Sequence, residues 1–232
     1  MNTPMAFTQN KVNFQSARRV NRSLTAPMEK RALTWMAERA PRWVSSDGLT
    51  ALGLGAQIGA GVCYWLARYD RRALLLVIVC LMLNWLGDSL DGTLARVRHQ
   101  ERPRYGFYVD HVVDIVGAVA LMCGLGCSDL LHWPIAMAML IAFLVLASES
   151  YLATYTLGSF ELSQGLFGPT EIRILLAMGS LAALRSPYAS LLGHRWLLFD
   201  LGGAIAAIFM SATATGVMVR HIAQLYKQEP LP

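Results

Sequence analysis

Charged residues are scarce in this chain of 232 residues. Asp, Glu, Lys and Arg make up only 15% of it, whereas hydrophobic residues make up 55% and the mean hydropathy is +0.41. A soluble globular domain carries about 25% charged residues. The composition therefore excludes an ordinary soluble protein. It predicts a single-domain membrane protein that crosses the bilayer several times.

Signals of several other protein classes are also missing. The first 27 residues contain no apolar core, so no cleavable signal peptide is expected. The four cysteines fall within apolar segments and have no His or Cys partner at ligand spacing, so they are predicted to be buried free thiols. The net charge of +5 does not indicate a nucleic-acid partner, because the basic residues lie mostly beside apolar segments.

Apolar segments of about 20 residues, the length that crosses a bilayer, dominate the rest of the chain. Residues 1–26 are polar and are expected to form a flexible tail. Residues 27–232 are expected to form one membrane domain. It begins with Pro27–Val44, where Trp, Met and Leu mix with Lys and Arg as in an amphipathic helix of the membrane interface. The predicted spans are Leu49–Ala67, Ala73–Ala95, Tyr108–Leu125, Pro134–Tyr155, Thr170–Leu184 and Leu197–Arg220.

The expected fold class is thus an all-α membrane protein with six transmembrane helices after an interfacial helix. The serines at positions 45 and 46 are suitable N-cap residues for the first span. The fifth span is short, so it must either extend toward Ser190 or let Arg173 and Arg185 snorkel to the interface.

The distribution of Lys and Arg predicts the orientation. Eight precede the first span, four lie in the link of residues 96–104, and Arg173, Arg220 and Lys227 share that side; the other five lie opposite. The positive-inside rule then places both termini in the cytoplasm of a cell-membrane protein.

Four aspartates lie where the second predicted span ends and the third begins. Asp88 and Asp91 are three residues apart, and Asp110 and Asp114 are four apart, so each pair shares one helix face. A charge at mid-bilayer costs about 2.5–3.5 kcal/mol, so acids within spans usually have a function. The short link makes the two helices antiparallel neighbours, and their acidic faces are expected to meet at the cytoplasmic boundary. Small residues accompany the acids, where a ligand or a backbone would come close: Gly92, Ala95 and Gly106.

Four carboxylates in one place need counter-charge, because each disfavours ionisation of the others. Two divalent cations would supply it, and a ligand set of oxygens favours Mg²⁺ or Mn²⁺ over zinc. Two such ions about 4 Å apart can hold the attacking and leaving oxygens of a phosphoryl-type transfer. Since the sequence has neither a Ser-His-Asp arrangement nor a Gly-rich phosphate loop, this cluster is what suggests a reaction.

Residues Asp88–Asp114 contain two conspicuous stretches separated by nine residues. The first reads D-S-L-D-G-T-L-A-R and the second reads G-F-Y-V-D-H-V-V-D. The segment as a whole resembles the signature of the CDP-alcohol phosphotransferases (also called CDP-alcohol phosphatidyltransferases), integral membrane enzymes of phospholipid synthesis. Every fixed position of that signature is present. The plan of six spans after an interfacial helix extends the resemblance over most of the chain.

The resemblance implies a role for each matching residue. Asp88, Asp91 and Asp110 would bind metal, and Asp114 would bind the second metal ion and act as general base. The acceptor hydroxyl would attack the phosphorus that bears the lipid alcohol, and CMP would leave. The family also suggests a homodimer, and small-residue stretches in the third and fourth spans are candidate contacts. The CDP pocket would be lined by Asp88, Asp91, Gly92, Ala95, Arg96 and Gly106.

Residues outside the motif have more than one interpretation. Arg173, near the start of the fifth span, could bind a phosphate of donor or acceptor, or could belong to an ordinary helix start. Arg102 and Arg104 could contact an anionic headgroup or a phosphorylated acceptor, although a loop that sets orientation is favoured. Thr50 and Asn84 are expected on the approaches to the cavity, and Glu149 is expected to be paired or to line it. For His111 a packing role is favoured over a ligand role.

Two functions compete with transfer of a phosphatidyl group from CDP-diacylglycerol to a small polar alcohol. In the first, CDP carries a headgroup such as choline or ethanolamine and diacylglycerol attacks; the motif does not separate the two, and the compact chain favours CDP-diacylglycerol. The second is a cation transporter. Transporters usually show inverted repeats and midplane sites, whereas here the acids lie at one edge and nothing repeats.

Overall fold

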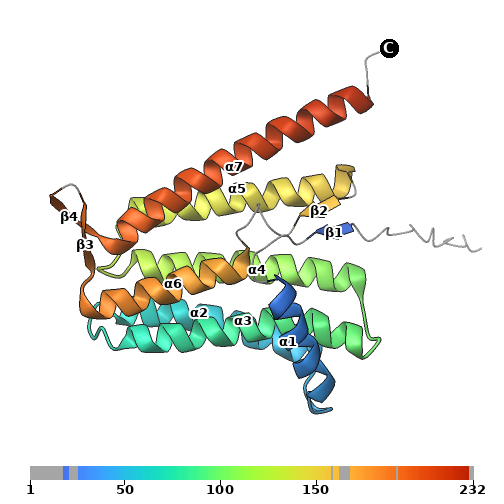
Figure 1. Cartoon of the computed structure of the whole chain (residues 1–232), viewed down its shortest axis with the longest axis horizontal. Coiled ribbons are helices and arrows are strands. Elements are labelled where there is room, and N and C mark those ends of the chain that lie inside the picture. Colours follow the sequence, from blue (N-terminus) through green and yellow to red (C-terminus); the bar gives the residue numbers. More distant parts are fainter. Residues whose placement is uncertain (1–17, 21–25, 158, 162–167, 192, 230–232) are drawn as a thin grey trace, which may run out of the picture.

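The computed structural model describes residues 18–20, 26–157, 159–161, 168–191 and 193–229. This part of the chain is almost entirely helical (Figure 1). The elements in chain order are β1 (Arg18–Val20), α1 (Ala26–Arg39), α2 (Ser46–Leu66), α3 (Ala73–Val97), α4 (Pro103–Gly126), α5 (Trp133–Leu157), β2 (Ser159–Glu161), α6 (Pro169–Arg185), β3 (Tyr188–Leu191), β4 (His194–Leu197) and α7 (Leu198–Gln228).

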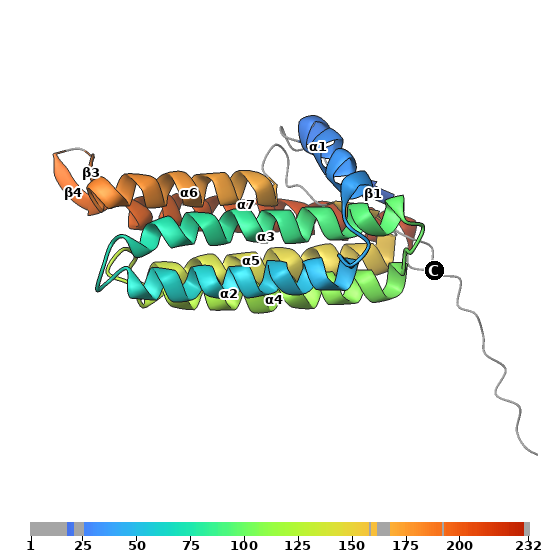
Figure 2. The same cartoon turned by 90° about the horizontal axis from the view of Figure 1, so that it is seen from below.

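Helices α2 to α7 run up and down the long axis of the molecule, and α1 crosses the bundle near the end where α6 begins (Figures 1 and 2). Five helices of the described part, α2, α3, α4, α5 and α7, are long and apolar enough to cross a membrane. The all-helical membrane class is confirmed. Helix α6 has 17 residues, about 25 Å at 1.5 Å per residue, which is shorter than the usual crossing length. Its crossing stays a prediction.

Helices α2 and α3 pack closely against each other. A Cβ atom on Gly87 would lie 2.6 Å from the backbone nitrogen of Gly53 and 2.6 Å from the carbonyl oxygen of Leu49. No side chain fits there, so the two backbones touch directly, as small residues allow between membrane helices. This contact fixes the position of α3 along α2, and α3 carries the first two aspartates, Asp88 and Asp91.

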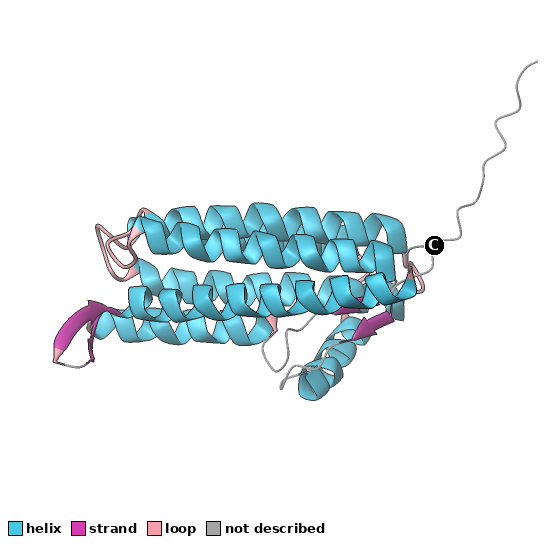
Figure 3. Ribbon diagram, turned by 90° about the horizontal axis from the view of Figure 1, so that it is seen from above, coloured by secondary structure: helices cyan, strands magenta, loops and turns pink. Residues whose placement is uncertain are grey.

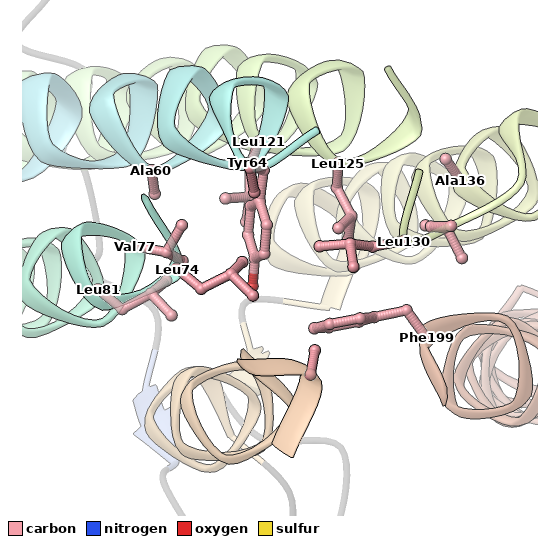
Figure 4. Packing of buried hydrophobic residues seen from close by; sticks show 13 residues of the cluster. Ala60, Tyr64, Leu74, Val77, Leu81, Leu121, Leu125, Leu130, Ala136 and Phe199 are labelled. Carbon is pink, nitrogen blue, oxygen red and sulfur yellow. The ribbon is translucent and has the colours of Figure 1, made fainter. Parts of the chain in front are cut away.

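The main core lies where α2, α4 and α6 end and α3, α5 and α7 begin. Figure 4 shows the packing of its side chains. Tyr64 of α2 has no exposed surface, and its hydroxyl lies 2.9 Å from the hydroxyl of Ser180 on α6. Its ring meets Phe199 of α7 edge-on, with 5.9 Å between the ring centroids. This core therefore brings α2, α6 and α7 together, and the opposite ends of α2 and α6 lie beside the aspartates.

Helices α5 and α7 are fastened to each other near both ends. The backbone N–H of His132, just before α5, donates to Asp200 of α7 at 2.8 Å, and the His132 ring contacts the same carboxylate. Farther along, Glu149 is buried and lies 2.5 Å from Nδ1 of His221. The sequence alone identified no partner for Glu149.

Two predictions about the ends of helices need correction. The helix expected over Pro27–Val44 ends at Arg39, because Pro41 disfavours a helical conformation for the residue before it. Helix α6 does not extend toward Ser190: it ends at Arg185, since Ser186 precedes Pro187 and is extended. The chain then forms the β3–β4 hairpin, which turns at Gly193 (φ +79°).

Two short sheets are present that the sequence did not predict (Figure 3). One is the antiparallel β3–β4 hairpin, and the other pairs β1 with β2 in parallel. Residues 18–20 of the predicted flexible tail therefore form a strand, and residues 1–17 and 21–25 lie outside the described part.

Candidate active site

Helices α3 and α4 bring the four aspartates of the motif to one end of the bundle. Asp114 interacts electrostatically with Asp88, Asp91 and Asp110, and also with Arg173 of α6. The four carboxylates, 26 residues apart at most in the chain, therefore lie close enough to interact, and Arg173 lies among them. The convergence predicted for the two acidic faces is confirmed.

Asp88 is held by α6. Nη2 of Arg173 donates to its Oδ2 at 2.5 Å, and both side chains are largely shielded from solvent. Nε of Arg173 donates to Oδ1 of Asn84, one turn before Asp88 on α3, at 2.7 Å. Asn84 is 4% exposed, and its amide in turn donates to the Gly53 carbonyl at 2.9 Å. Arg173 thus faces the site and does not snorkel away from it.

Asp91 is held by the start of α2. The Thr50 hydroxyl donates to its Oδ2 at 2.6 Å, and the Ser46 hydroxyl donates to its backbone carbonyl at 2.9 Å. The N–H of Gly92 donates to its Oδ1 at 2.5 Å. Ser45 caps the helix as predicted, accepting a hydrogen bond from Gly48 N–H at 3.0 Å. The capping turn therefore positions a motif carboxylate as well as starting α2.

Open space adjoins the small residues of the motif. A Cβ atom on Gly106 would meet nothing within 4 Å, and one on Gly92 would meet only Nη1 of Arg96, at 3.5 Å. Arg96 is exposed and donates to the Thr93 hydroxyl at 3.0 Å. No neighbouring backbone of the described residues approaches either glycine, so the room beside them suits a ligand.

The face of α4 next to Asp110 and Asp114 is closed by aromatic rings from α4 and α5. His111 packs against Phe107 and Tyr151, with 4.1 and 4.5 Å between ring centroids, and its Nδ1 lies 2.6 Å from the Phe107 carbonyl. This confirms the packing role favoured for His111. Tyr151 interacts electrostatically with both aspartates, and the sequence did not single it out.

The donor set suits a hard divalent cation. Four carboxylates supply only oxygens, which Mg²⁺ and Mn²⁺ prefer. Within the described ranges, no three Asp, Glu, His or Cys side chains already enclose a metal position, because Asp88 turns toward Arg173 and Asp91 toward Thr50. A carboxylate has about four lone-pair sites, so these contacts leave acceptor capacity on each. The four aspartates are therefore suited to binding Mg²⁺ or Mn²⁺.

The remaining predicted candidates lie at the edge of the site. Arg104 is exposed at the start of α4. Arg102 pairs with Asp47 on the first turn of α2 and stacks on Tyr105, 4.2 Å from the ring centroid. The Asp47 carboxylate also raises the pKa of Arg102. Arg102 thus joins the starts of α2 and α4, a role that sequence reasoning missed because the partner lies 55 residues away.

Comparison with known proteins gives one family match. The family model for CDP-alcohol phosphatidyltransferase matches residues 43–218, which include every residue placed at the site above. No curated protein matches the chain.

Proposed function

Because this chain belongs to the CDP-alcohol phosphatidyltransferase family and is an enzyme of that class, we propose that its donor is CDP-diacylglycerol and its acceptor a small polar alcohol. The acceptor hydroxyl oxygen attacks the phosphorus that bears the diacylglycerol. A new P–O bond forms, the bond from that phosphorus to the CMP oxygen breaks, and CMP leaves. The product is a phospholipid.

The observation that carries this proposal is the convergence of four carboxylates and Arg173 beside open space. We assign Asp88, Asp91 and Asp110 as metal ligands and Asp114 as both ligand and general base. Asp114 accepts the proton of the acceptor hydroxyl, a role that needs a carboxylate within hydrogen-bond reach of the attacking oxygen. When bound, two Mg²⁺ or Mn²⁺ ions would neutralise the charge of the pyrophosphate.

The other residues of the motif shape the donor pocket. Gly92, Ala95 and Gly106 leave room for the CDP moiety, and Arg96 offers positive charge to phosphate. When Asp88 binds a metal ion, the guanidinium of Arg173 can bind a phosphate instead. This favours a phosphorylated acceptor. Arg104, exposed at the pocket edge, is a second candidate for the acceptor phosphate.

The decisive experiment measures CMP release by purified protein. CDP-diacylglycerol is tested against a series of alcohols, with and without Mg²⁺ or Mn²⁺, and CDP-choline and CDP-ethanolamine are tested with diacylglycerol. We expect release from CDP-diacylglycerol with one acceptor class, abolished by EDTA and restored by either metal. Release from the CDP-headgroup donors alone would reverse the donor assignment.

Asp114→Asn tests the assigned base. Removal of a general base lowers kcat by about 10²- to 10⁴-fold. Asp129→Asn is the matched control, since Asp129 is exposed in the loop after α4 at the other end of the bundle and should keep full activity. Full activity of Asp114→Asn would refute the assignment of Asp114 as general base.

The transporter alternative has its own test. Cation flux into liposomes without nucleotide would support a transporter instead of an enzyme.

A further inference from the structure

The carboxylate of Glu29 on α1 lies between two helices of the candidate active site. Its Oε1 accepts three hydrogen bonds: from Trp85 Nε1 at 2.8 Å and Ser89 Oγ at 3.1 Å, both on α3, and from Thr170 Oγ1 at 3.0 Å on α6. Thr170 lies 141 residues from Glu29 in the chain. One oxygen of α1 therefore ties the first turn of α6 to α3.

Each donor to Glu29 is a near neighbour in sequence of Asn84, Asp88 or Arg173, the three residues that join α3 to α6 inside the site. Trp85 follows Asn84 and Ser89 follows Asp88, while Thr170 lies one turn before Arg173. The seam between α3 and α6 thus has two layers. The inner layer is the contact of Arg173 with Asp88 and Asn84, and the outer layer is Glu29 with its donors.

Helix α1 is built to present this carboxylate. Glu29, Leu33 and Ala37 lie at i, i+4 and i+8 and so share one face. Leu33 and Ala37 are 6% and 2% exposed and pack with Leu90 and Leu94 of α3. The aligned apolar residues place α1 on α3, and Glu29 on the same face meets the seam between α3 and α6.

The far end of α1 is fastened separately. The guanidinium of Arg98 donates to the carbonyls of Ala40 at 3.1 Å, Pro41 at 2.9 Å and Val44 at 2.5 Å. Carbonyls after a helix end need such donors. Among the described residues, the side-chain hydrogen bonds of Arg98 go to residues 40–44 after α1 and not to α6, so anchoring of α1 and bracing of α6 can be separated by mutation.

We propose that Glu29 is a positioning residue for the candidate active site, holding the first turn of α6 against α3 so that Arg173 is fixed beside Asp88. The inference rests on the proposed function for its effect on turnover. Its structural part, the bracing of α6 by α1, stands independently.

The first test is amide hydrogen exchange of the full chain in lipid nanodiscs. Glu29→Ala should speed exchange in the second turn of α6, at residues 173–176. Thr170→Val, which removes one donor at nearly constant volume, should do the same. Three controls should leave that turn unchanged: Glu38→Ala on the exposed face of α1, Thr156→Val on an exposed position of α5, and Arg98→Ala, which loosens the far end of α1.

The second test compares kinetics in two backgrounds. Glu29→Ala should lower kcat/KM by about tenfold or more, since misplacing a group by about 1 Å costs up to about 10²-fold. In an Arg173→Ala background it should cause no further loss, because it acts through Arg173. Equal losses in both backgrounds would overturn the proposal, as would unchanged α6 exchange in both Glu29→Ala and Thr170→Val, or the same α6 loosening in Arg98→Ala.

The two proposals fail differently. If the wild-type protein releases no CMP from any CDP-alcohol, the proposed function fails, while the exchange experiment still decides whether Glu29 braces α6. If CMP is released normally and α6 exchange does not respond to either substitution, only the role of Glu29 is refuted.

Discussion

Arg173 is a charged side chain on an apolar helix, and two of its nitrogens donate to side chains of α3 while only 13% of its side-chain surface is exposed. Asp88 and Asn84 accept from two of its nitrogens, and Asn84 is itself held by the backbone of α2. An arginine beside carboxylates has a defined place, because the planar guanidinium is oriented by both acceptors. That place is inside the cluster of aspartates.

We expect Arg173→Ala to raise the acceptor KM by about tenfold to a hundredfold if the acceptor is phosphorylated. Hydrogen bonds to charged groups contribute about 1.5–3 kcal/mol, and about 1.4 kcal/mol is a factor of ten. The measurement is CMP release as a function of acceptor concentration. Arg185→Ala, at the exposed far end of α6, is the control. An unchanged KM in Arg173→Ala would exclude phosphate binding by this residue.

At the scale of elements, the close contact of α2 with α3 is what orients both members of the first aspartate pair. Thr50 and Ser46 reach Asp91 from α2, and Gly53 accepts from Asn84 beside Asp88. These hydrogen bonds require the two helix axes to be very near each other. Small residues at the crossing make that possible.

Gly87→Ala should therefore destabilise the protein by about 1–3 kcal/mol, as overpacking of a filled site does. Its Cβ would lie 2.6 Å from backbone atoms of α2, which cannot rotate away. Gly55→Ala is the matched control, because a Cβ there meets nothing within 4 Å. The measurement is thermal unfolding in detergent, where about 1 kcal/mol corresponds to about 2–4 °C for a chain of this size. Equal melting temperatures for the two variants would contradict the packing argument.

At the scale of the whole molecule, aromatic and basic residues gather near both ends of the bundle. Arg39 stacks on Trp35 near the aspartate end, while Arg68 stacks on Tyr69 and Arg195 lies over Tyr188 at the opposite end. Such residues typically lie at the headgroup level of a membrane. The excess of Lys and Arg on the aspartate side predicts that this side is cytoplasmic. The association of two copies of this chain into a homodimer also stays a prediction.

The topology can be tested by thiol labelling of a variant whose four cysteines are replaced. We expect Arg195→Cys to react with a membrane-impermeant maleimide in intact cells. Arg42→Cys and Lys227→Cys should react only after permeabilisation, because six crossings, α6 included, place both on the inner side. All three positions are exposed. Labelling of just one of Arg42→Cys and Lys227→Cys in intact cells would contradict six crossings.

Local properties of the sequence determined the helices and the motif. Runs of apolar residues predicted every long helix to within a few residues at its start, apart from α4, which begins at Pro103 rather than Tyr108. Fixed spacing on two neighbouring helices was enough to predict that Asp88, Asp91, Asp110 and Asp114 would meet. These inferences succeed because helix periodicity and a short link leave few alternatives.

Only the tertiary structure decided which partners hold those residues. Arg173 and Asp88 are 85 residues apart, Glu149 and His221 are 72 apart, and Glu29 and Thr170 are 141 apart. No periodicity relates such positions, because their contact depends on how separate helices pack. The sequence could show that these charges are costly to bury, but the fold alone determines which side chain satisfies each one.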